Sequence, residues 1–236
     1  MWHILALLLG ASIGSFLNVV VYRLPKKGLK LWDPFYSFCI HCGHRLSWKD
    51  NIPIISYVLL KGRCRYCGAK IPVRYLLVEV LNTALYLVES YLTYDVSTLV
   101  SLWGITSTLI AISFMDLETW HVHDSLIVSL AIFSFVFFLR NTYWMDGLVS
   151  EAVGFGLFYF LYKVKKGMGS GDVMVVAASA FTMDPMTFSL AVLISAATGL
   201  SASLVLFKGL KPKKALPFTP FLSVGIMFGI LKTVWR

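Results

Sequence analysis

Two aspartates lie where an apolar chain is expected to avoid charge. Asp116 directly follows the apolar run 109–115, and Asp172 ends the glycine-rich stretch 167–172. An ionisable group at the end of a hydrophobic span is costly to desolvate and by default marks a functional site. Two carboxylates that share a site cannot both ionise easily, so one keeps a proton while the other acts as a base toward water. The pair is therefore a candidate for acid–base hydrolysis of an amide without metal or covalent nucleophile.

Each aspartate also has a purely structural interpretation. A carboxylate can cap a helix N-terminus or pair with a nearby cation, and Lys165 and Lys166 lie close to Asp172 in the chain. Asp124 follows Asp116 by eight residues and adds a third carboxylate. It is a candidate for a further acid, for a cap of the helix that begins there, or for a group that contacts the substrate. The sequence leaves these alternatives open.

Glycine recurs at alternate positions just before the second aspartate. Gly167, Gly169 and Gly171 predict an interruption of the helix, because glycine adds backbone freedom that disfavours a helix interior. Non-helical backbone is tolerated at membrane depth only where protein buries it or where it lines a wet cavity. We therefore expect that water or a peptide can reach Asp172 at this point.

All four cysteines lie in one polar segment and form two CxxC pairs, Cys39 with Cys42 and Cys64 with Cys67. Two such pairs predict tetrahedral zinc, because each tight turn directs two thiolates at one ion and the second pair closes the four-sulfur shell. Gly43 and Gly68 follow the pairs and supply the backbone freedom of such turns. A closed shell has no open position for water, so this zinc would be structural. Disulfides are the alternative, and His41 or His44 could replace a thiolate.

The elements that must position these residues are apolar helices. The chain of 236 residues is 58% hydrophobic and 14% charged, with a mean hydropathy of +0.75, which excludes an ordinary soluble domain. A spanning helix needs about 20 mostly apolar residues. Such runs lie near 2–22, 74–94, 97–115, 124–139, 147–163, 172–182, 187–207 and 216–234. The expected fold class is all-α: a polytopic membrane protein with about eight transmembrane helices and a small zinc-binding loop.

Positive charge indicates how these helices are oriented. If the N-terminus lies outside, 18 of the 21 Lys and Arg residues fall in the segments 23–74, 116–123, 163–171 and 208–214. By the positive-inside rule these segments are cytoplasmic, both termini lie outside, and the cysteine loop lies in the reducing cytosol, where disulfides are rare. The net charge of +9 then serves orientation and contact with anionic lipid, and predicts no nucleic-acid partner.

The motifs also follow a specific order along the chain. Residues 14–25 come first, then 48–53, 62–68 and 74–79, then Asp116 with Asp124, and finally 169–173 and 217–221. This ordered set resembles the bacterial type IV prepilin peptidase family, bifunctional enzymes of the GxGD aspartic protease class. The chain departs from the family pattern at His123, where proline is usual, at Met174, where lysine is common, and at Thr219, where glycine is usual.

The resemblance implies an enzyme of the bacterial plasma membrane with its active site facing the cytoplasm. Asp116 and Asp172 would be the catalytic dyad that removes the leader of prepilins or pseudopilins, as in type IV pilus, type II secretion and competence systems. Members with the cysteine loop also transfer a methyl group from S-adenosylmethionine to the new amino terminus. The chain would then comprise a first helix at 1–22, a zinc-binding loop linked to methyl transfer at 23–73, and peptidase helices at 74–236.

Small and polar residues inside two predicted helices indicate packing and a possible pocket. Gly10 and Gly14 offer a small-xxx-small face on the first helix. Glu79, Asn82 and Tyr86 share one face of the second helix, because they lie at positions i, i+3 and i+7. They could line a methyl-donor or substrate site, with Glu79 as an auxiliary residue, or form structural hydrogen bonds. The sequence does not locate the methyl-donor site or define an oligomeric state.

Two other functions fit part of the pattern. A non-enzymatic membrane assembly factor would use the zinc knuckle to dock cytoplasmic proteins and the acids as structural ion pairs. A methyltransferase whose peptidase half has decayed would fit the departures at His123 and Met174. Processing of a prepilin separates these hypotheses, since the assembly factor cleaves nothing and the decayed peptidase only methylates.

Overall fold

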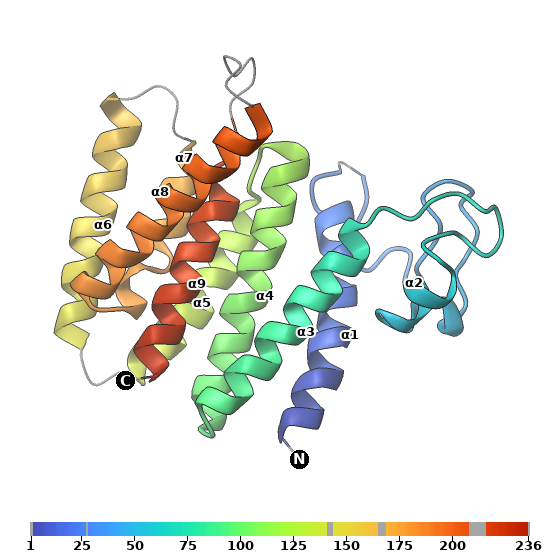
Figure 1. The fold of residues 1–236 in the computed structure, drawn as a ribbon, viewed down its shortest axis with the longest axis horizontal. Coiled ribbons are helices and arrows are strands. Elements are labelled where there is room, and N and C mark those ends of the chain that lie inside the picture. The colour runs from blue at the N-terminus through green and yellow to red at the C-terminus, as the bar shows by residue number, and fades with distance from the viewer. Residues whose placement is uncertain (1, 27, 141–143, 165–168, 208–215, 236) are drawn as a thin grey trace. The chain divides into compact units, whose positions relative to one another are not determined.

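The computed structural model describes residues 2–26, 28–140, 144–164, 169–207 and 216–235 (Figure 1). Each of the eight apolar runs forms a helix, which confirms the all-α class. These helices are α1 (Trp2–Arg23), α3 (Arg74–Leu92), α4 (Val96–Thr119), α5 (Asp124–Leu139), α6 (Trp144–Val164), α7 (Ser170–Ala177), α8 (Pro185–Phe207) and α9 (Thr219–Trp235). Three short turns of helix complete the described elements: η1 (Trp48–Asn51), α2 (Ile55–Leu59) and η2 (Ala180–Thr182).

Four of these helices, α1, α4, α6 and α8, are long and apolar enough to cross a membrane. Helices α5 and α9 and the segment 170–182 are apolar but shorter, and α3 carries Glu79 and Glu89 within its length. The chain is therefore a multi-pass membrane protein. Within the described residues, four helices have both the length and the hydropathy of a transmembrane helix.

The chain forms two compact units, residues 1–91 and 92–236. In the first unit, α1 and α3 pack through the small residues of α1. A Cβ added at Gly10 would lie 2.8 Å from the Thr83 Cα atom, and one added at Gly14 would lie 2.9 Å from the Glu79 Cα atom. The backbones approach this closely only because both positions lack a side chain. The predicted small-residue packing face is thus confirmed.

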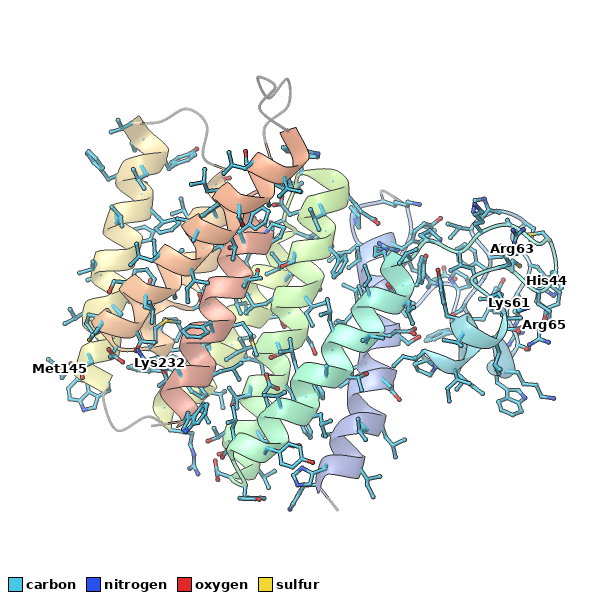
Figure 2. The ribbon with its side chains drawn as sticks, viewed as in Figure 1. His44, Lys61, Arg63, Arg65, Met145 and Lys232 are labelled. Carbon is cyan, nitrogen blue, oxygen red and sulfur yellow. The ribbon has the colours of Figure 1, made fainter. Side chains whose placement is uncertain are left out.

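The long loop between α1 and α3 is anchored at the end of α1. The Arg23 guanidinium is buried and donates to three loop carbonyls, those of Leu31 at 3.0 Å, Pro34 at 2.7 Å and Tyr36 at 3.0 Å. Since a buried charge must find partners, these bonds hold the first part of the loop against α1. Farther along the loop, Figure 2 shows the labelled side chains of His44, Lys61, Arg63 and Arg65 gathered on one side of it.

The second unit is a helical bundle in which α4 packs against α5 and α9, and α9 packs against α8. The contact between α8 and α9 is close, because a Cβ added at Gly225 would collide with the carbonyl oxygen of Ala191. Helix α7 is short and packs against α6, with further contacts to α5 and α9. This packing places the C-terminal end of α4 and the N-terminal ends of α7 and α9 where their side chains can meet.

Candidate active site and metal centre

Asp116 lies in the last turns of α4, which packs against α5 and α9. Its side chain is buried, with 8% of the residue exposed. The helix ends at Thr119, and the C-cap residue Trp120 has a left-handed backbone (φ 58°) and donates its N–H to the Asp116 carbonyl at 2.9 Å. A non-glycine residue in this conformation is uncommon and terminates the helix sharply. The turn therefore leaves the Asp116 carboxyl near the end of the apolar span, as the sequence predicts.

Asp172 is the third residue of α7 and is also buried, at 6% exposed. Gly169 is the N-cap, and its backbone N–H donates to the Asp172 carboxylate, so this aspartate also caps α7. The expected interruption of helix is only partly correct: the backbone at Gly169 is extended, but Gly171 lies inside α7. Gly167, Lys165 and Lys166 lie outside the described residues.

Gly171 lies inside α7, so its lack of a side chain matters for packing and not for a turn of the backbone. A Cβ added at Gly171 would lie 3.3 Å from a methyl carbon of Val122, which is buried in the turn between α4 and α5. This distance is tighter than most Cβ contacts, so a larger residue would require the Val122 side chain to shift by a few tenths of an ångström. Gly171 thus supports the position of the neighbouring Asp172.

Thr219 brings the two aspartates together. It is the first residue of α9 and is 2% exposed, and its hydroxyl donates to the Asp172 Oδ1 atom at 2.8 Å. The hydroxyl and the backbone of Thr219 also form hydrogen bonds with the Asp116 carboxyl, and the two carboxyls interact electrostatically. Residues from α4, α7 and α9 therefore meet in one buried polar cluster.

This role of Thr219 is one that the sequence reasoning missed. Its only signal was a polar residue between Phe218 and Pro220, at the start of an apolar run and at a position where the resembled family has glycine. A hydroxyl carries one proton and two lone pairs, so it can donate to one carboxylate and accept from a protonated carboxyl. The cluster therefore suits two carboxyls that hold one proton between them.

Asp124 is exposed at the first residue of α5. The cap of this helix is His123, whose Nδ1 atom accepts from the Ser125 N–H at 3.3 Å. Of the three roles considered for Asp124, the capping role is therefore wrong, because the preceding residue fills it. A carboxylate in the first turn still interacts favourably with the helix dipole.

The four cysteines converge in the first unit, as predicted. Their Sγ atoms all lie within 4.8 Å of one another, and those of Cys39 and Cys67 are 3.9 Å apart. A tetrahedral zinc ion with Zn–S bonds of about 2.3 Å separates its sulfurs by about 3.8 Å, so the cluster fits this ion. All four thiols are free, which contradicts the disulfide alternative.

Both pairs adopt the same turn. The Gly43 N–H donates to the Cys39 carbonyl and the Gly68 N–H to the Cys64 carbonyl, each at 2.9 Å. The φ angles of Gly43 and Gly68 are +70° and +69°, values that favour glycine. The predicted need for glycine after each CxxC pair is thus confirmed, because the chain must turn back there to direct two sulfurs at one point.

Asp50 braces the second cysteine pair. Its carboxylate accepts from the Ser47 hydroxyl at 2.7 Å, the Arg65 Nε at 2.7 Å and the Tyr66 hydroxyl at 3.1 Å. Burial by itself would raise the pKa of Asp50, but these hydrogen bonds outweigh burial and lower the pKa from 3.8 to about 2. Asp50 is therefore ionised at neutral pH and links η1 to the turn that carries Cys64 and Cys67.

Glu79 lies in the first unit, whereas the aspartate pair lies in the second. It is 8% exposed, and its carboxyl accepts from the Ile54 N–H at 2.7 Å and from the Ser15 hydroxyl. Ile54 has a φ of 62°, which is strained for a β-branched residue. Glu79 thus holds a strained point of the loop against α1 and α3.

A multi-pass helical protein with a buried carboxylate pair and a four-cysteine cluster has the features of a membrane-embedded aspartic peptidase with a metal-binding loop. Residues 8–93 match the bacterial peptidase A24 N-terminal domain, and residues 103–204 match the type IV leader peptidase family. The chain belongs to the bacterial peptidase A24 family of prepilin leader peptidases and N-methyltransferases. Asp116 and Asp172 lie within the second match, and Thr219 lies beyond its end.

Several relatives cover almost the whole chain. The prepilin leader peptidase/N-methyltransferase of Dichelobacter nodosus is 33% identical over 92% of this chain and 87% of its own length. The enzyme of the same description from Pectobacterium carotovorum subsp. carotovorum is 32% identical over 94% of this chain and 90% of its own. A type 4 prepilin-like proteins leader peptide-processing enzyme of Escherichia coli O78:H11 is 30% identical, with coverages of 94% and 91%. No solved structure matches.

Proposed function

We propose that this chain is an intramembrane aspartic endopeptidase that removes the leader of prepilins or pseudopilins and then methylates the new amino terminus. The observation that carries the peptidase assignment is the single buried hydroxyl of Thr219, which bonds to both Asp116 and Asp172. Two carboxyls held this closely in an apolar bundle provide a general acid and a general base in one place.

The proposed hydrolysis needs only water and the two carboxyls. One carboxylate takes a proton from water while the water oxygen bonds to the carbonyl carbon of the scissile peptide, and the other carboxyl gives its proton to the carbonyl oxygen. When the C–N bond breaks, its electron pair goes to nitrogen, which takes up a proton from the pair. One hydroxyl of the tetrahedral intermediate returns a proton to the pair and becomes the carbonyl oxygen of the new carboxyl group, so the pair regains its starting proton. The protons belong to the pair and are not assigned to one member. Gly169 and Gly171 act as auxiliary residues that hold Asp172 in place.

Asp124 is proposed as an auxiliary contact for the substrate. It is exposed at the start of α5, which follows the turn after Asp116. The leaders of this substrate class are short and basic, so an exposed carboxylate beside the predicted cytoplasmic end of α4 would attract them. We expect Asp124→Asn to raise KM more than it lowers kcat.

The membrane topology is part of the proposal. We infer eight transmembrane helices, with both termini outside and the site facing the cytoplasm of a bacterial plasma membrane, from the distribution of Lys and Arg. Met145 and Lys232 lie in or next to segments that are predicted to be outside. Figure 2 shows both side chains toward the same end of the second unit. A substrate could then enter laterally with its apolar helix in the bilayer and its leader in the cytosol.

The proposed cofactors differ in role. Zinc would be held by Cys39, Cys42, Cys64 and Cys67 and would be structural, because a four-sulfur shell leaves no open position. S-adenosylmethionine would supply the methyl group: the amine nitrogen bonds to the methyl carbon, the electron pair of the broken C–S bond returns to sulfur, and the amine loses a proton to solvent. The relatives that are described as N-methyltransferases support this part of the proposal.

The peptidase proposal is tested by Asp116→Asn and Asp172→Asn, each coexpressed with a prepilin. We expect both variants to lose cleavage by a factor of about 100 or more, because each removes half of an acid–base pair. Mass spectrometry of the pilin N-terminus measures the loss, and a thermal unfolding curve of the purified variant checks the fold. Asp146→Asn, an exposed aspartate at the start of α6, is the matched control.

Each rival function predicts a different result. Full processing by both aspartate variants would refute the assigned dyad. A wild-type chain that neither cleaves nor methylates would support the assembly factor, and one that methylates a pre-cleaved pilin without removing any leader would support the decayed peptidase.

A further inference from the structure

A cavity lies in the first unit between α1, the start of α3 and the cysteine loop. Its volume is about 150 Å³, and it is lined among others by Asn18, Glu79 and Asp50 and by the aromatic residues Tyr57 and Tyr75. A second hollow of about 570 Å³ adjoins it, since Ser15, Val19 and Asn51 line both. All of these residues belong to residues 1–91 and none is part of the aspartate cluster.

Asn18 lines this cavity and carries an unsatisfied acceptor. The residue is 2% exposed, and its Nδ2 atom donates to the Tyr75 carbonyl at 3.0 Å and lies 3.5 Å from the Gly14 carbonyl. These carbonyls fix the orientation of the amide, because exchanging its oxygen and nitrogen would place an acceptor against two acceptors. The Oδ1 atom is left buried without a partner. A buried polar atom in this state is costly unless a ligand satisfies it.

The polar lining of the cavity mixes donors, such as tyrosine and serine hydroxyls, with the carboxylates of Asp50 and Glu79. Glu79 uses part of its carboxyl for the Ile54 N–H and the Ser15 hydroxyl, and a carboxylate has capacity for further donors. The two arginines on the wall are already engaged, since Arg23 bonds three loop carbonyls and Arg65 bonds Asp50. The Asn18 Oδ1 atom and the Glu79 carboxyl are therefore the acceptors with open capacity, and together they favour a ligand group that is cationic or carries N–H donors.

We propose that this cavity is the methyl-donor site, with Asn18 and Glu79 as binding residues. The proposal rests on the N-methyltransferase function proposed above and names the site for it. A methyl sulfonium is a cation, and S-adenosylmethionine also carries amine donors, so both of its features match the unsatisfied oxygen and the carboxyl. The cavity by itself holds one end of such a ligand, and the adjoining hollow gives room for the remainder.

The position of the cavity also explains why a zinc knuckle accompanies methyl transfer. Cys39 and Cys64 line the same cavity as Asn18 and Glu79. The zinc site would therefore act as a structural wall of the donor site, holding the loop over α1 and α3, and would not touch the reacting methyl group.

Binding is measured by titration calorimetry on the zinc-loaded full chain in nanodiscs. The probe is sinefungin, a non-transferring analogue with an ammonium in place of the methyl sulfonium, and the comparison is S-adenosylhomocysteine, whose sulfur is neutral. We expect the wild type to prefer sinefungin by about tenfold, and Glu79→Gln to lose that preference. Asn18→Leu should weaken the binding of both ligands by about tenfold. Glu89→Gln, a buried glutamate near the other end of α3, is the control and should bind as the wild type.

A variant is counted only if it retains a full equivalent of zinc, which shows that the loop is folded. If Glu79→Gln loses zinc, Val19→Phe replaces it, because it fills the cavity without removing a hydrogen bond and should abolish binding of both ligands. If all cavity variants bind both ligands with wild-type affinity, the cavity is not the methyl-donor site. A wild-type chain that does not methylate a pre-cleaved pilin would instead refute the N-methyltransferase function, so the two failures are distinguishable.

Discussion

At the scale of single residues, Thr219 is the least expected member of the aspartate cluster. A glycine at this position, as the resembled family has, offers the cluster only a backbone N–H. Threonine adds a hydroxyl that donates to Asp172 and also bonds to Asp116. In a buried environment such a charge-assisted hydrogen bond is stronger than at a wet surface, so the hydroxyl should help to position the two carboxyls for reaction.

Thr219→Val keeps the shape of the side chain and removes its hydroxyl. We expect kcat for prepilin cleavage to fall by about tenfold to a hundredfold, which corresponds to the loss of a hydrogen bond to a charged group, while KM changes little. Steady-state cleavage of a pilin peptide measures both constants. Thr219→Ser restores the hydroxyl and should recover most of kcat. Unchanged kcat in Thr219→Val would mean that the hydroxyl only fills space.

At the scale of elements, helix pairs in both units approach through glycine rather than through large side chains. Gly10 and Gly14 let α1 lie against α3, and Gly225 lets α9 lie against α8. Packing of this kind depends on van der Waals contact between backbones, since apolar side chains gain little by leaving lipid. The same α1–α3 contact positions Asn18, Glu79 and the base of the cysteine loop.

Gly14→Ala therefore tests the first helix pair. The added Cβ would lie 2.9 Å from the Glu79 Cα atom, so α1 and α3 must separate. We expect a loss of about 1–3 kcal/mol in stability, typical of overpacking, and weaker zinc retention. Thermal unfolding in one detergent and zinc analysis measure the two effects.

The matched control for this change is Gly156→Ala in α6, where an added Cβ would meet nothing within 4 Å. It should leave stability unchanged or raise it slightly, because alanine favours a helix interior. Equal stability of the two alanine variants would contradict close packing of α1 on α3.

At the scale of the whole molecule, the chemistry is divided between the two compact units. The zinc ligands and the proposed donor cavity belong to residues 1–91, and the aspartate cluster belongs to residues 92–236. A unit with its own core can keep its local structure when the other loses a bound metal. Methyl transfer and peptide cleavage should therefore respond differently to the loss of zinc.

Removing zinc with a chelator, or replacing Cys64 and Cys67 by serine, tests this separation. We expect loss of sinefungin binding and of methylation, because the loop that walls the cavity depends on the metal for its fold. Cleavage of the leader should continue. Mass spectrometry of one pilin sample reports both products, and adding zinc back to the chelated protein should restore methylation. A parallel fall of cleavage and methylation would contradict the separation.

The sequence by itself determined the features that depend on local pattern. Apolar runs, some of them shorter than a full span, predicted α1 and α3 to α9, because burial of backbone in lipid requires helix. Two CxxC pairs, each followed by glycine, predicted the cysteine cluster, since the turn and its ligands lie within a few residues. The ordered motifs likewise indicated the family to which the chain belongs.

Only the tertiary structure decided which distant residues meet. The bonds of Thr219 to Asp116 and Asp172 depend on how α4, α7 and α9 pack, and the cavity behind Asn18 and Glu79 depends on how a long loop folds over two helices. Local pattern also misjudged Gly171, which lies inside α7, where a side chain would contact Val122 of the neighbouring turn. Such contacts arise from the shape and packing of whole elements, and hydropathy and residue spacing carry little information about either.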